Sequence, residues 1–330
     1  MQKLMAITLF IGWTTLASLH GIAQQPADTP YFRKLALDND IEAYMGKYNK
    51  VFSFIRVNND NFITHHKLMA NTSSYIGVHA DYKWLSADLS TGLPRTFVDN
   101  AIHGRKALGI HLGKTTDKMR IDGGYERFNG LVLPLTTRPA HHDLKTGFTY
   151  TDYSLQATYI FNAGKFSLPA AMNYGAVQLR SAGTLLTNIS TTVHMFTQPA
   201  DSARHPSPGA SHVMQALGDH PSWMNTIVHG GYAYNFIVGH GNWSINPWLM
   251  TGIGAQRELK GKAATKLVYD YRCTLTMGYN SPQVYVYLNA FYNHIESRLR
   301  YSNLIVRDND LWLTVGYRLG TLSHKIMGLL

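Results

Sequence analysis

Seven charged residues follow an alternating pattern in two stretches of the chain. They are Lys118, Arg120, Asp122 and Glu126 in the first stretch and Lys266, Asp270 and Arg272 in the second. Side chains at alternate positions of a strand share one face, so each group would line a single surface. Charges lining a narrow channel select solutes, and charges that pair with one another fill the space instead. Both uses stay open on the sequence alone.

Histidine is the other residue type that suggests a site, because the chain has sixteen of them. The densest groups are His65-His66 and His141-His142-Asp143. Neighbouring side chains on a strand point apart and chelate a metal poorly. There is no H-E-x-x-H motif and no cysteine beside these histidines. We therefore expect neither a metal nor a cofactor, and we interpret the histidines as surface residues.

Nucleophilic catalysis has little support in the sequence. The chain has no G-x-S-x-G motif and no P-loop. Ser190, Thr192 and His194 share one face of a predicted strand, but Ser190 and His194 are too far apart there for a proton relay. Some barrel phospholipases carry a Ser–His pair on their outer wall, so a lipid-acting enzyme stays an alternative. The residues favour a protein that is not an enzyme.

Strands must position these residues, because apolar and polar side chains alternate with a period of two through most of the chain. The clearest case puts Leu267, Tyr269, Tyr271, Cys273, Leu275, Met277 and Tyr279 opposite Lys266, Asp270 and Arg272. The same pattern occurs at 76–82, 85–89, 108–112, 119–125, 153–161, 183–195, 228–238, 243–255, 284–292, 311–319 and, more weakly, 62–69. These stretches predict twelve strands.

The strands are longer than those of typical sandwiches, and aromatic residues lie near their ends at Trp243, Tyr279, Tyr292 and Tyr317. Both features favour a barrel over a soluble two-sheet sandwich. We predict an all-β fold, an antiparallel transmembrane β-barrel of about twelve strands (ten to fourteen). Short and long connections alternate only if residues 165–180 do not span and are instead periplasmic or folded inward. The charged faces would then line the lumen, since charges facing lipid are costly.

The N-terminus predicts export. Residues 1–23 read as a cleavable signal peptide, with Lys3, an apolar run and small residues at Gly21 and Ala23. The run is too short and interrupted for a membrane anchor. We expect a periplasmic segment at 24–48, the barrel at 49–320 and a C-terminal extension at 321–330, in the cell outer membrane.

The chain is basic, with 30 lysines and arginines against 20 acidic residues. These basic residues are scattered, and an exported protein does not meet nucleic acid, so we expect no nucleic-acid partner. Outer-membrane lipid, lipopolysaccharide and the barrel-assembly machinery are the expected partners. Anionic solutes also fit the charge, as does a charge without any specific partner. Cys273 is the only cysteine and reads as a small hydrophobe.

Three stretches resemble a known family. They are Asn71–Leu93, Gly104–Leu133 and, most specifically, Tyr159–Ser190, YIFNAGKFSLPAAMNYGAVQLRSAGTLLTNIS. They are similar to the Bacteroidota outer-membrane family known as domain-of-unknown-function family 4421. The resemblance covers nearly all of the mature chain and implies an outer-membrane β-barrel without an assigned activity. The chain departs from the family at Leu168-Pro169, and the proline supports an irregular conformation there.

Three functions stay open. The first is a narrow pore or transport-related barrel for small solutes, anionic ones included. The second is a membrane-embedded enzyme acting on lipid, and the third is a closed structural or interaction barrel. We expect a filled or narrow lumen, because Tyr285, Tyr287 and Phe291 share the predicted lumenal face. The loop 197–224 is rich in Pro, Ser and His, and it either folds inward, binds an external partner or moves freely.

Overall fold

The computed structural model describes residues 30–35, 39–57, 63–70, 74–82, 85–96, 106–132, 148–197, 222–239, 241–259, 265–299 and 302–319. Several expectations fall outside these ranges. They concern the signal peptide 1–23, the extension 321–330, residues 198–221 of the long loop, His141-His142-Asp143 and the side chains of His65 and His66.

The described chain is almost entirely strand. The elements are β1 Phe32–Lys34, β2 Asn39–Val57, β3 Ile63–Ala70, β4 Ser74–Tyr82, β5 Leu85–Gly92, β6 Lys106–Thr115, β7 Met119–Val132, β8 Phe148–Ile160, α2 Leu168–Met172, β9 Ala176–Gln178, β10 Ala182–Thr197, β11 Ser222–Val238, β12 Trp243–Glu258, β13 Lys266–Asn280, β14 Val284–Arg298 and β15 Asn303–Leu319.

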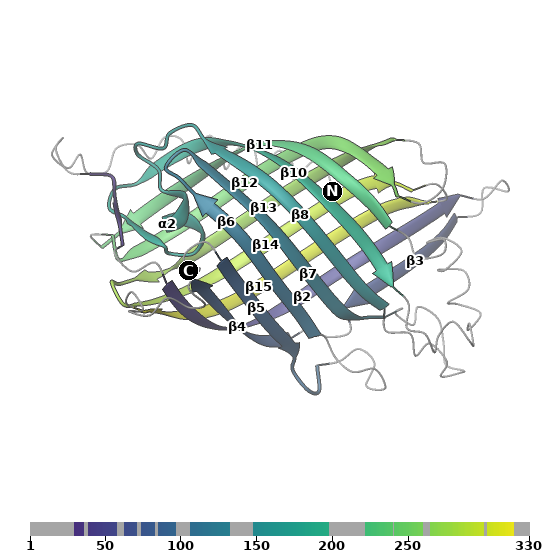
Figure 1. Ribbon diagram of the computed structural model, residues 1–330, viewed down its shortest axis with the longest axis horizontal. Helices are drawn as coiled ribbons and strands as arrows, with labels where there is room; N and C mark the ends of the chain where they lie inside the picture. Colours follow the sequence, from purple (N-terminus) through teal and green to yellow (C-terminus); the bar gives the residue numbers. More distant parts are fainter. Residues whose placement is uncertain are drawn as a thin grey trace, which may run out of the picture. The chain divides into compact units, whose positions relative to one another are not determined.

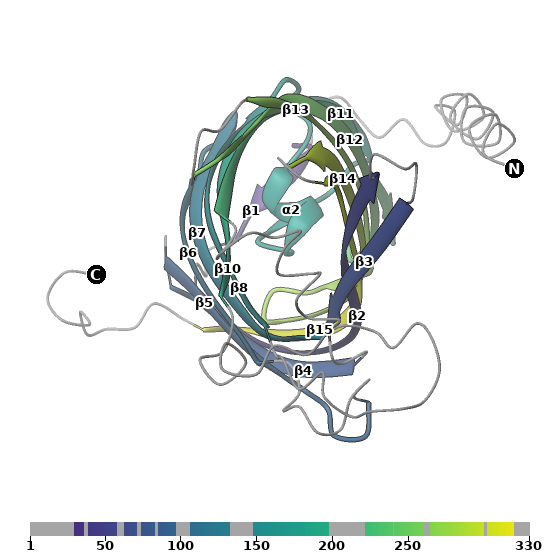
Figure 2. The same ribbon diagram turned by 90° about the vertical axis from the view of Figure 1, so that its right-hand side faces the viewer.

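The large sheet closes into an antiparallel barrel (Figures 1 and 2). Its order is β15-β14-β13-β12-β11-β10-β8-β7-β3-β2-β4-β5-β6, and β15 also pairs with β2 and β7 with β6. β3 and β4 pair with successive parts of β2, from Val57↔Ile63 to Val51↔Met69 and from Lys47↔Ser74 to Asn39↔Tyr82. They therefore act as one broken strand, and counted so the barrel has twelve strands. The predicted fold class is confirmed.

The barrel narrows at one end. β3 pairs directly with β7 at Ala70↔Leu131, just beyond the last pairing of β6 with β7 at Lys106↔Asn129. Gly130 lies where β7 changes its partner from β6 to β3. Its φ is 92, a backbone conformation that glycine adopts without a steric penalty. The β5–β6 hairpin thus stops short, and ten strands form this end of the barrel.

The two ends also differ in their connections. The narrow end carries the long connections between β7 and β8 and between β10 and β11, and we call it the loop end. The other end carries the short turns at 116–118, 239–242 and 281–283, and we call it the turn end. Outer-membrane barrels place long loops outside the cell and short turns in the periplasm.

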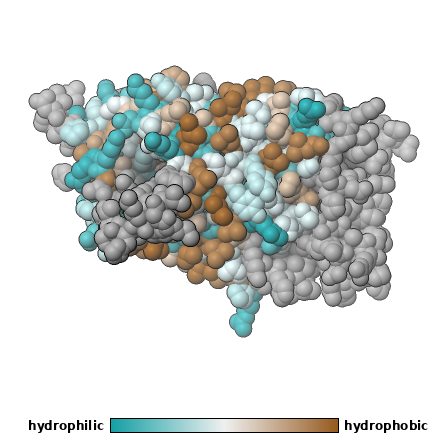
Figure 3. Space-filling view, viewed as in Figure 1, coloured by the Kyte–Doolittle hydropathy of each residue, from teal (hydrophilic) through white to brown (hydrophobic). Residues whose placement is uncertain are grey.

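The outward face of the wall is apolar. Leu267 is 53% exposed and Tyr271 48%, whereas Asp270 between them is fully buried. Apolar residues gather across the middle of the wall on the face seen in Figure 3. Cys273 lies on this outward face and is exposed. The strand alternation therefore separates a lipid-compatible exterior from a polar interior.

Helices contribute little to the described chain. None of the helices in the described ranges is long and apolar enough to cross a membrane.

The barrel begins at Asn39, so residues 39–48, which we expected in a periplasmic segment, belong to β2 and pair with β15. The strand was hidden because its residues do not alternate cleanly in polarity. Its inward side chains include Tyr44 and Tyr48, while Lys47 faces outward.

Residues 161–181, between β8 and β10, do not span and form a plug within the lumen (Figure 2). Ser167 caps the N-terminus of α2 by accepting from the Ala170 amide at 3.3 Å, and Pro169 lies in the first turn. Proline is tolerated there because the first amides of a helix have no intrahelical acceptor. The plug continues into β9, which pairs with β1.

Candidate functional site

Gln178 joins the plug to the barrel and to the N-terminal strand. Its amide oxygen accepts from the Ser167 amide at 2.9 Å and from Asn235 of β11 at 3.0 Å. Its amide nitrogen donates to the carbonyls of Lys165 at 2.6 Å and Tyr31 at 3.1 Å. One buried side chain thus connects three parts of the chain that lie far apart in sequence.

Arg318 of β15 is the second anchor of the plug. It is 3% exposed, and its guanidinium donates to the carbonyl of Tyr174 and to Asn280 Oδ1, the latter at 2.8 Å. Asn280 in turn donates to the carbonyl of Ala176 at 2.9 Å. Hydrogen bonds from a charged group to buried acceptors are stronger than neutral ones, so Arg318 holds the plug firmly at the turn end.

A stack of tyrosines covers the inner side of the plug. The Tyr174 ring lies 5.3 Å from that of Tyr287 and 6.3 Å from that of Tyr285. The carboxylate of Glu42 accepts from Tyr285 at 2.8 Å and from Tyr287 at 3.2 Å. Burial raises the pKa of Tyr174 to about 12, so its hydroxyl is neutral at physiological pH.

An aromatic closure blocks the loop end. The Phe52 ring of β2 lies 4.9 Å from the Phe196 ring of β10, and these strands are on opposite sides of the barrel. Trp223 packs on Phe196 at 5.7 Å. The cluster comprises Phe52, Phe54, Leu68, Ala70, Phe128, Leu131, Tyr150, Phe196, Trp223, Leu299, Leu304 and Val306. Narrowing to ten strands brings these side chains within contact across the lumen.

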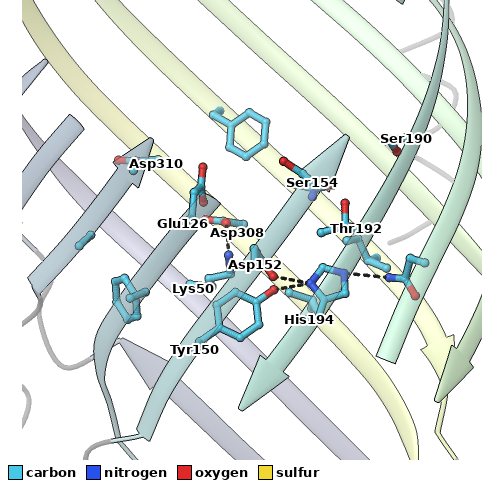
Figure 4. A pocket seen from close by; sticks show the side chains of 18 of the residues that line it. Lys50, Glu126, Tyr150, Asp152, Ser154, Ser190, Thr192, His194, Asp308 and Asp310 are labelled. Carbon is cyan, nitrogen blue, oxygen red and sulfur yellow. Dashed lines mark hydrogen bonds and ion pairs between the residues drawn. The ribbon is translucent and has the colours of Figure 1, made fainter. Parts of the chain in front are cut away.

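A polar chamber lies between the aromatic closure and the plug, and Figure 4 shows side chains that line it. It consists of a cavity of about 450 Å³ and an adjoining one of about 340 Å³. The two share Asp88, Glu126, Asp310 and Trp312 as lining residues. Asn173 of the plug lines the smaller cavity. The lumen is therefore neither an open channel nor fully packed.

Paired charges lie at the loop-end side of the chamber (Figure 4). His194 Nδ1 lies 2.6 Å from Asp152 Oδ1, and His194 Nε2 lies 3.2 Å from Asn225 Nδ2. Lys50 pairs with Asp308 at 3.1 Å. Asp152 and Asn225, the partners of His194, belong to neighbouring strands. Ser190, on the same strand as His194, is not among its partners, so the described contacts show no Ser–His relay.

A second set of polar side chains runs along the inner surface of the wall, closer to the turn end. Hydrogen bonds connect its members in sequence, and we call it the polar belt: Arg120, Asp122, Gln156, Asn188, His229, Asp270 and Arg272. The donor–acceptor distances run from 2.6 Å between Gln156 and Asp122 to 3.4 Å between Asn188 and Gln156. The belt joins β7, β8, β10, β11 and β13 on the inner surface.

Both ring nitrogens of His229 lie within hydrogen-bond distance of a polar side chain. Asn188 donates its amide nitrogen to Thr158 at 2.8 Å, which turns its oxygen toward His229 Nδ1 at 3.1 Å. His229 Nε2 lies 2.8 Å from Asp270, and both side chains are fully buried. Asp270 also pairs with Arg272, 2.7 Å away.

Gly252 allows this contact to form. It stands between His229 and Asp270 in the register of β11, β12 and β13. A Cβ at position 252 would lie 2.3 Å from His229 Cδ2. Without a side chain on β12, the imidazole passes across that strand and reaches the carboxylate on the next.

The family model described as Domain of unknown function (DUF4421) matches residues 26–319. The chain belongs to this family. A search of curated protein sequences finds no match.

Solved structures that resemble this DUF4421 protein are outer-membrane proteins of low sequence identity. The outer membrane protease OmpT from Escherichia coli is 9% identical, with 89% of this chain and 100% of that chain covered and a TM-score of 0.36. The COG4313 outer membrane channel from Pseudomonas putida F1 is 11% identical, with 90% of this chain and 100% of that chain covered and a TM-score of 0.38. The translocator domain of the autotransporter NalP from Neisseria meningitidis is 11% identical, with 96% of this chain and 98% of that chain covered and a TM-score of 0.38.

The structure brings together four of the seven charged residues singled out from the sequence of this DUF4421 protein. Arg120, Asp122, Asp270 and Arg272 belong to the polar belt. Glu126 lines the chamber, 3.8 Å from His111. Lys266 is the first residue of β13 and pairs with Gln256. Lys118 is the exception, because it lies in the exposed turn before β7 and not on the strand.

Other members of the site were not singled out from the sequence. His229, Asn188 and Gln156 complete the belt, and Lys50 and Asp308 complete the charged cluster of the chamber. Asn188 and Gln156 do fall on the polar side of predicted strands, which was the available signal. Their partners depend on strand register, which alternation leaves undetermined. Within the described ranges, no three His, Cys, Asp or Glu side chains form a group that could hold a metal.

Proposed function

We propose that this protein is an outer-membrane barrel that admits small solutes through a lumen closed at both ends in its resting state. The chamber carries the proposal, because a lumen serving only as a structural support has no need of a polar cavity between two closures. The apolar outer wall and the predicted export signal support the outer membrane as its location.

Five acidic side chains line the larger cavity beside the basic Lys50, Arg127 and Arg272, and this acidic excess favours cations over the anions that the basic composition suggested: Asp88, Glu126, Asp152, Asp308 and Asp310. The carboxylate of Asp88 accepts from the Tyr44 hydroxyl, and that of Asp310 accepts from Tyr75 at 2.7 Å. Rings of acidic side chains favour cations in narrow pores, so we expect cation selectivity.

A closed structural barrel is the second candidate, and the polar belt favours it. Paired, hydrogen-bonded charges brace the wall without serving transport. The two functions differ in whether the lumen conducts once its closures are weakened.

Weakening both closures is expected to open the barrel. In planar bilayers, the wild-type protein should show rare openings. Arg318→Ala removes charged hydrogen bonds worth about 1.5–3 kcal/mol, so the open fraction should rise about tenfold or more if they form only in the closed state. Phe196→Ala should act in the same direction at the loop end, and the combined variant should conduct most, with a reversal potential that shows cation selectivity.

The control is Arg257→Ala, an exposed arginine on the outward side of β12, whose conductance should equal that of the wild type. Each variant is first checked for the heat-dependent electrophoretic mobility of a folded barrel. A folded combined variant that stays silent would reject the transport proposal in favour of the closed barrel.

A further inference from the structure

An apolar groove lies on the outward face of the wall, across the neighbouring strands β15, β2, β4 and β5. Its volume is about 700 Å³, and ligand sites commonly measure about 300–1,000 Å³. Ala43 creates the hollow, because its cross-strand neighbours Val315 and Val78 are larger. The other outward side chains of the lining are apolar except for one threonine: Met45, Ile76, Leu89, Thr91 and Leu313.

The groove ends where the outward face changes from apolar to polar. Along β2, the outward residues Ala43 and Met45 are followed by Lys47 toward the loop end. On β15, which runs in the opposite direction, the same change lies between Leu311 and Asn309. Outer-membrane barrels bound their apolar band at the level of the lipid headgroups. The groove therefore lies at the depth of the acyl chains in the leaflet nearer the loop end.

Two basic side chains belong to this end of the groove. Lys47 is exposed and lies two residues from Met45 on the same outward face of β2. Arg95 is exposed in the turn after β5, and this turn is tied to β4 because the Leu93 amide donates to the Ser74 carbonyl at 2.9 Å. Ser74 is the partner of Lys47 in the register of β2 and β4. The fold thus brings both basic residues to one place.

Arg95 has an unfavourable backbone conformation. Its φ is 69, in the left-handed region that glycine adopts easily and other residues rarely adopt. Thr96 closes the turn, because its hydroxyl donates to the Leu93 carbonyl at 2.8 Å. Strained residues of this kind gather at functional sites and ligand clamps. An arginine at a position suited to glycine therefore indicates a use for its side chain.

The carboxylates of these strands all lie on the other face of the wall. On the described parts of β2, β4, β5 and β15 they face the lumen: Asp40, Glu42, Asp81, Asp88, Asp308 and Asp310. Within the described ranges, neither Lys47 nor Arg95 has an ion-pair partner. The end of the groove thus carries positive charge that the protein itself does not balance, and an anionic group is its complement.

We infer that the groove binds a phosphorylated lipid of the outer leaflet, with an acyl chain along the hollow and a phosphate at Lys47 and Arg95. A hollow in a wall that faces hydrocarbon loses dispersion contacts unless a chain fills it. Phosphate is held by charge-assisted hydrogen bonds from lysine and arginine. The inference goes beyond the proposed function, and it holds whether or not the lumen conducts.

Native mass spectrometry of the full-length protein, folded in a neutral detergent, tests this site. The probe is diphosphoryl lipid A with six acyl chains, and the matched probe is the same lipid after removal of both phosphates. We expect one diphosphoryl lipid A to stay bound to each barrel. The dephosphorylated lipid should bind at least about tenfold more weakly, because hydrogen bonds between charged groups are lost.

The hollow is tested by filling it. Ala43→Phe places a ring in the groove and should weaken binding of diphosphoryl lipid A at least about tenfold, because the ring takes the space of the chain. The control is Ala80→Phe, which places the same ring on an exposed, outward alanine of β4 that does not line the groove. This control should bind as the wild type does. Each variant is first checked for the heat-dependent mobility of a folded barrel.

The basic end is tested by removing its charges. Lys47→Ala combined with Arg95→Gly should bind diphosphoryl lipid A no better than the wild type binds the dephosphorylated lipid. Glycine suits the backbone conformation at position 95, so the turn is kept. The control is Lys114→Ala combined with Arg257→Ala, which removes the same charge from exposed, outward positions on β6 and β12. It should leave binding unchanged.

Several results would overturn the inference. They are equal binding of the two lipids, equal effects of the two alanine variants, and equal losses from the two double variants. A dimer that Ala43→Phe dissociates would assign the groove to a second copy of the chain and would also overturn it. The bilayer experiment stays independent, since lipid binding to a barrel that never conducts rejects transport and keeps the site, and conduction without this binding does the reverse.

Discussion

Asp270→Ala should lower the free energy of unfolding by about 3–5 kcal/mol, the cost of leaving a buried charge without its partner. Here two side chains lose that partner, the buried imidazole of His229 and the guanidinium of Arg272. Denaturant titration of the protein in lipid vesicles, followed by tryptophan fluorescence, measures the loss. A second expected sign is a broader transition, because the belt links five strands.

The matched control is Asp117→Ala. Asp117 also pairs with a basic residue, Lys34 at 2.6 Å, but the two side chains are 59% and 72% exposed. Exposed pairs contribute about 0–1 kcal/mol, so this variant should unfold almost as the wild type does. Equal losses from Asp117→Ala and Asp270→Ala would show that the belt carries no special share of the stability.

Gly252→Ala should be nearly as damaging, by about 3 kcal/mol, although it adds only one methyl group. The new Cβ would lie 2.3 Å from His229 Cδ2 and 2.7 Å from Ile227 Cγ2. His229 is fully buried and cannot move aside without losing Asp270. The same vesicle titration measures the effect.

The reason for that loss can be checked with a double variant. Gly252→Ala and Asp270→Ala both act through His229, so together they should cost clearly less than the sum of their separate effects. Gly230→Ala is the control, because a Cβ at position 230 would meet nothing within 4 Å. Strictly additive losses would mean that Gly252 is needed for some reason other than the passage of the imidazole.

The direction in which side chains point was predictable from the sequence. Alternation assigned Leu267 and Tyr271 to the outside and Asp270 and Arg272 to the lumen, and the exposures agree. This works because successive side chains of a strand must face opposite ways. It required no knowledge of which strands are neighbours.

Partnerships between side chains were not predictable in the same way. His194 was considered with Ser190 on its own strand, yet its partner is Asp152, directly opposite on β8. The contact between His229 and Asp270 even crosses an intervening strand at Gly252. Such pairs depend on register, and a shift of one residue would exchange the two faces of a strand.

The hypothesis of anionic solutes came from the net charge of the chain, and it stays a prediction. The excess of 30 basic over 20 acidic residues is a sum over the whole chain. A solute in the lumen meets only the inward residues, and around the chamber these include the acidic Asp88, Glu126 and Asp310 and the basic Lys50 and Arg272. Local potential, and not total charge, determines what a channel attracts.

The seam between the first and last barrel strands constrains the order in which the molecule can fold. β2 pairs with β15 from Asn39↔Leu319 to Ile55↔Asn303, and closing so long a loop carries the largest entropic cost in the chain. Arg318, which holds the plug, also lies on β15. Pairing of β15 with β2 therefore completes the ring, and the same strand carries the residue that fastens the plug, so closure of the wall and attachment of its contents depend on one strand.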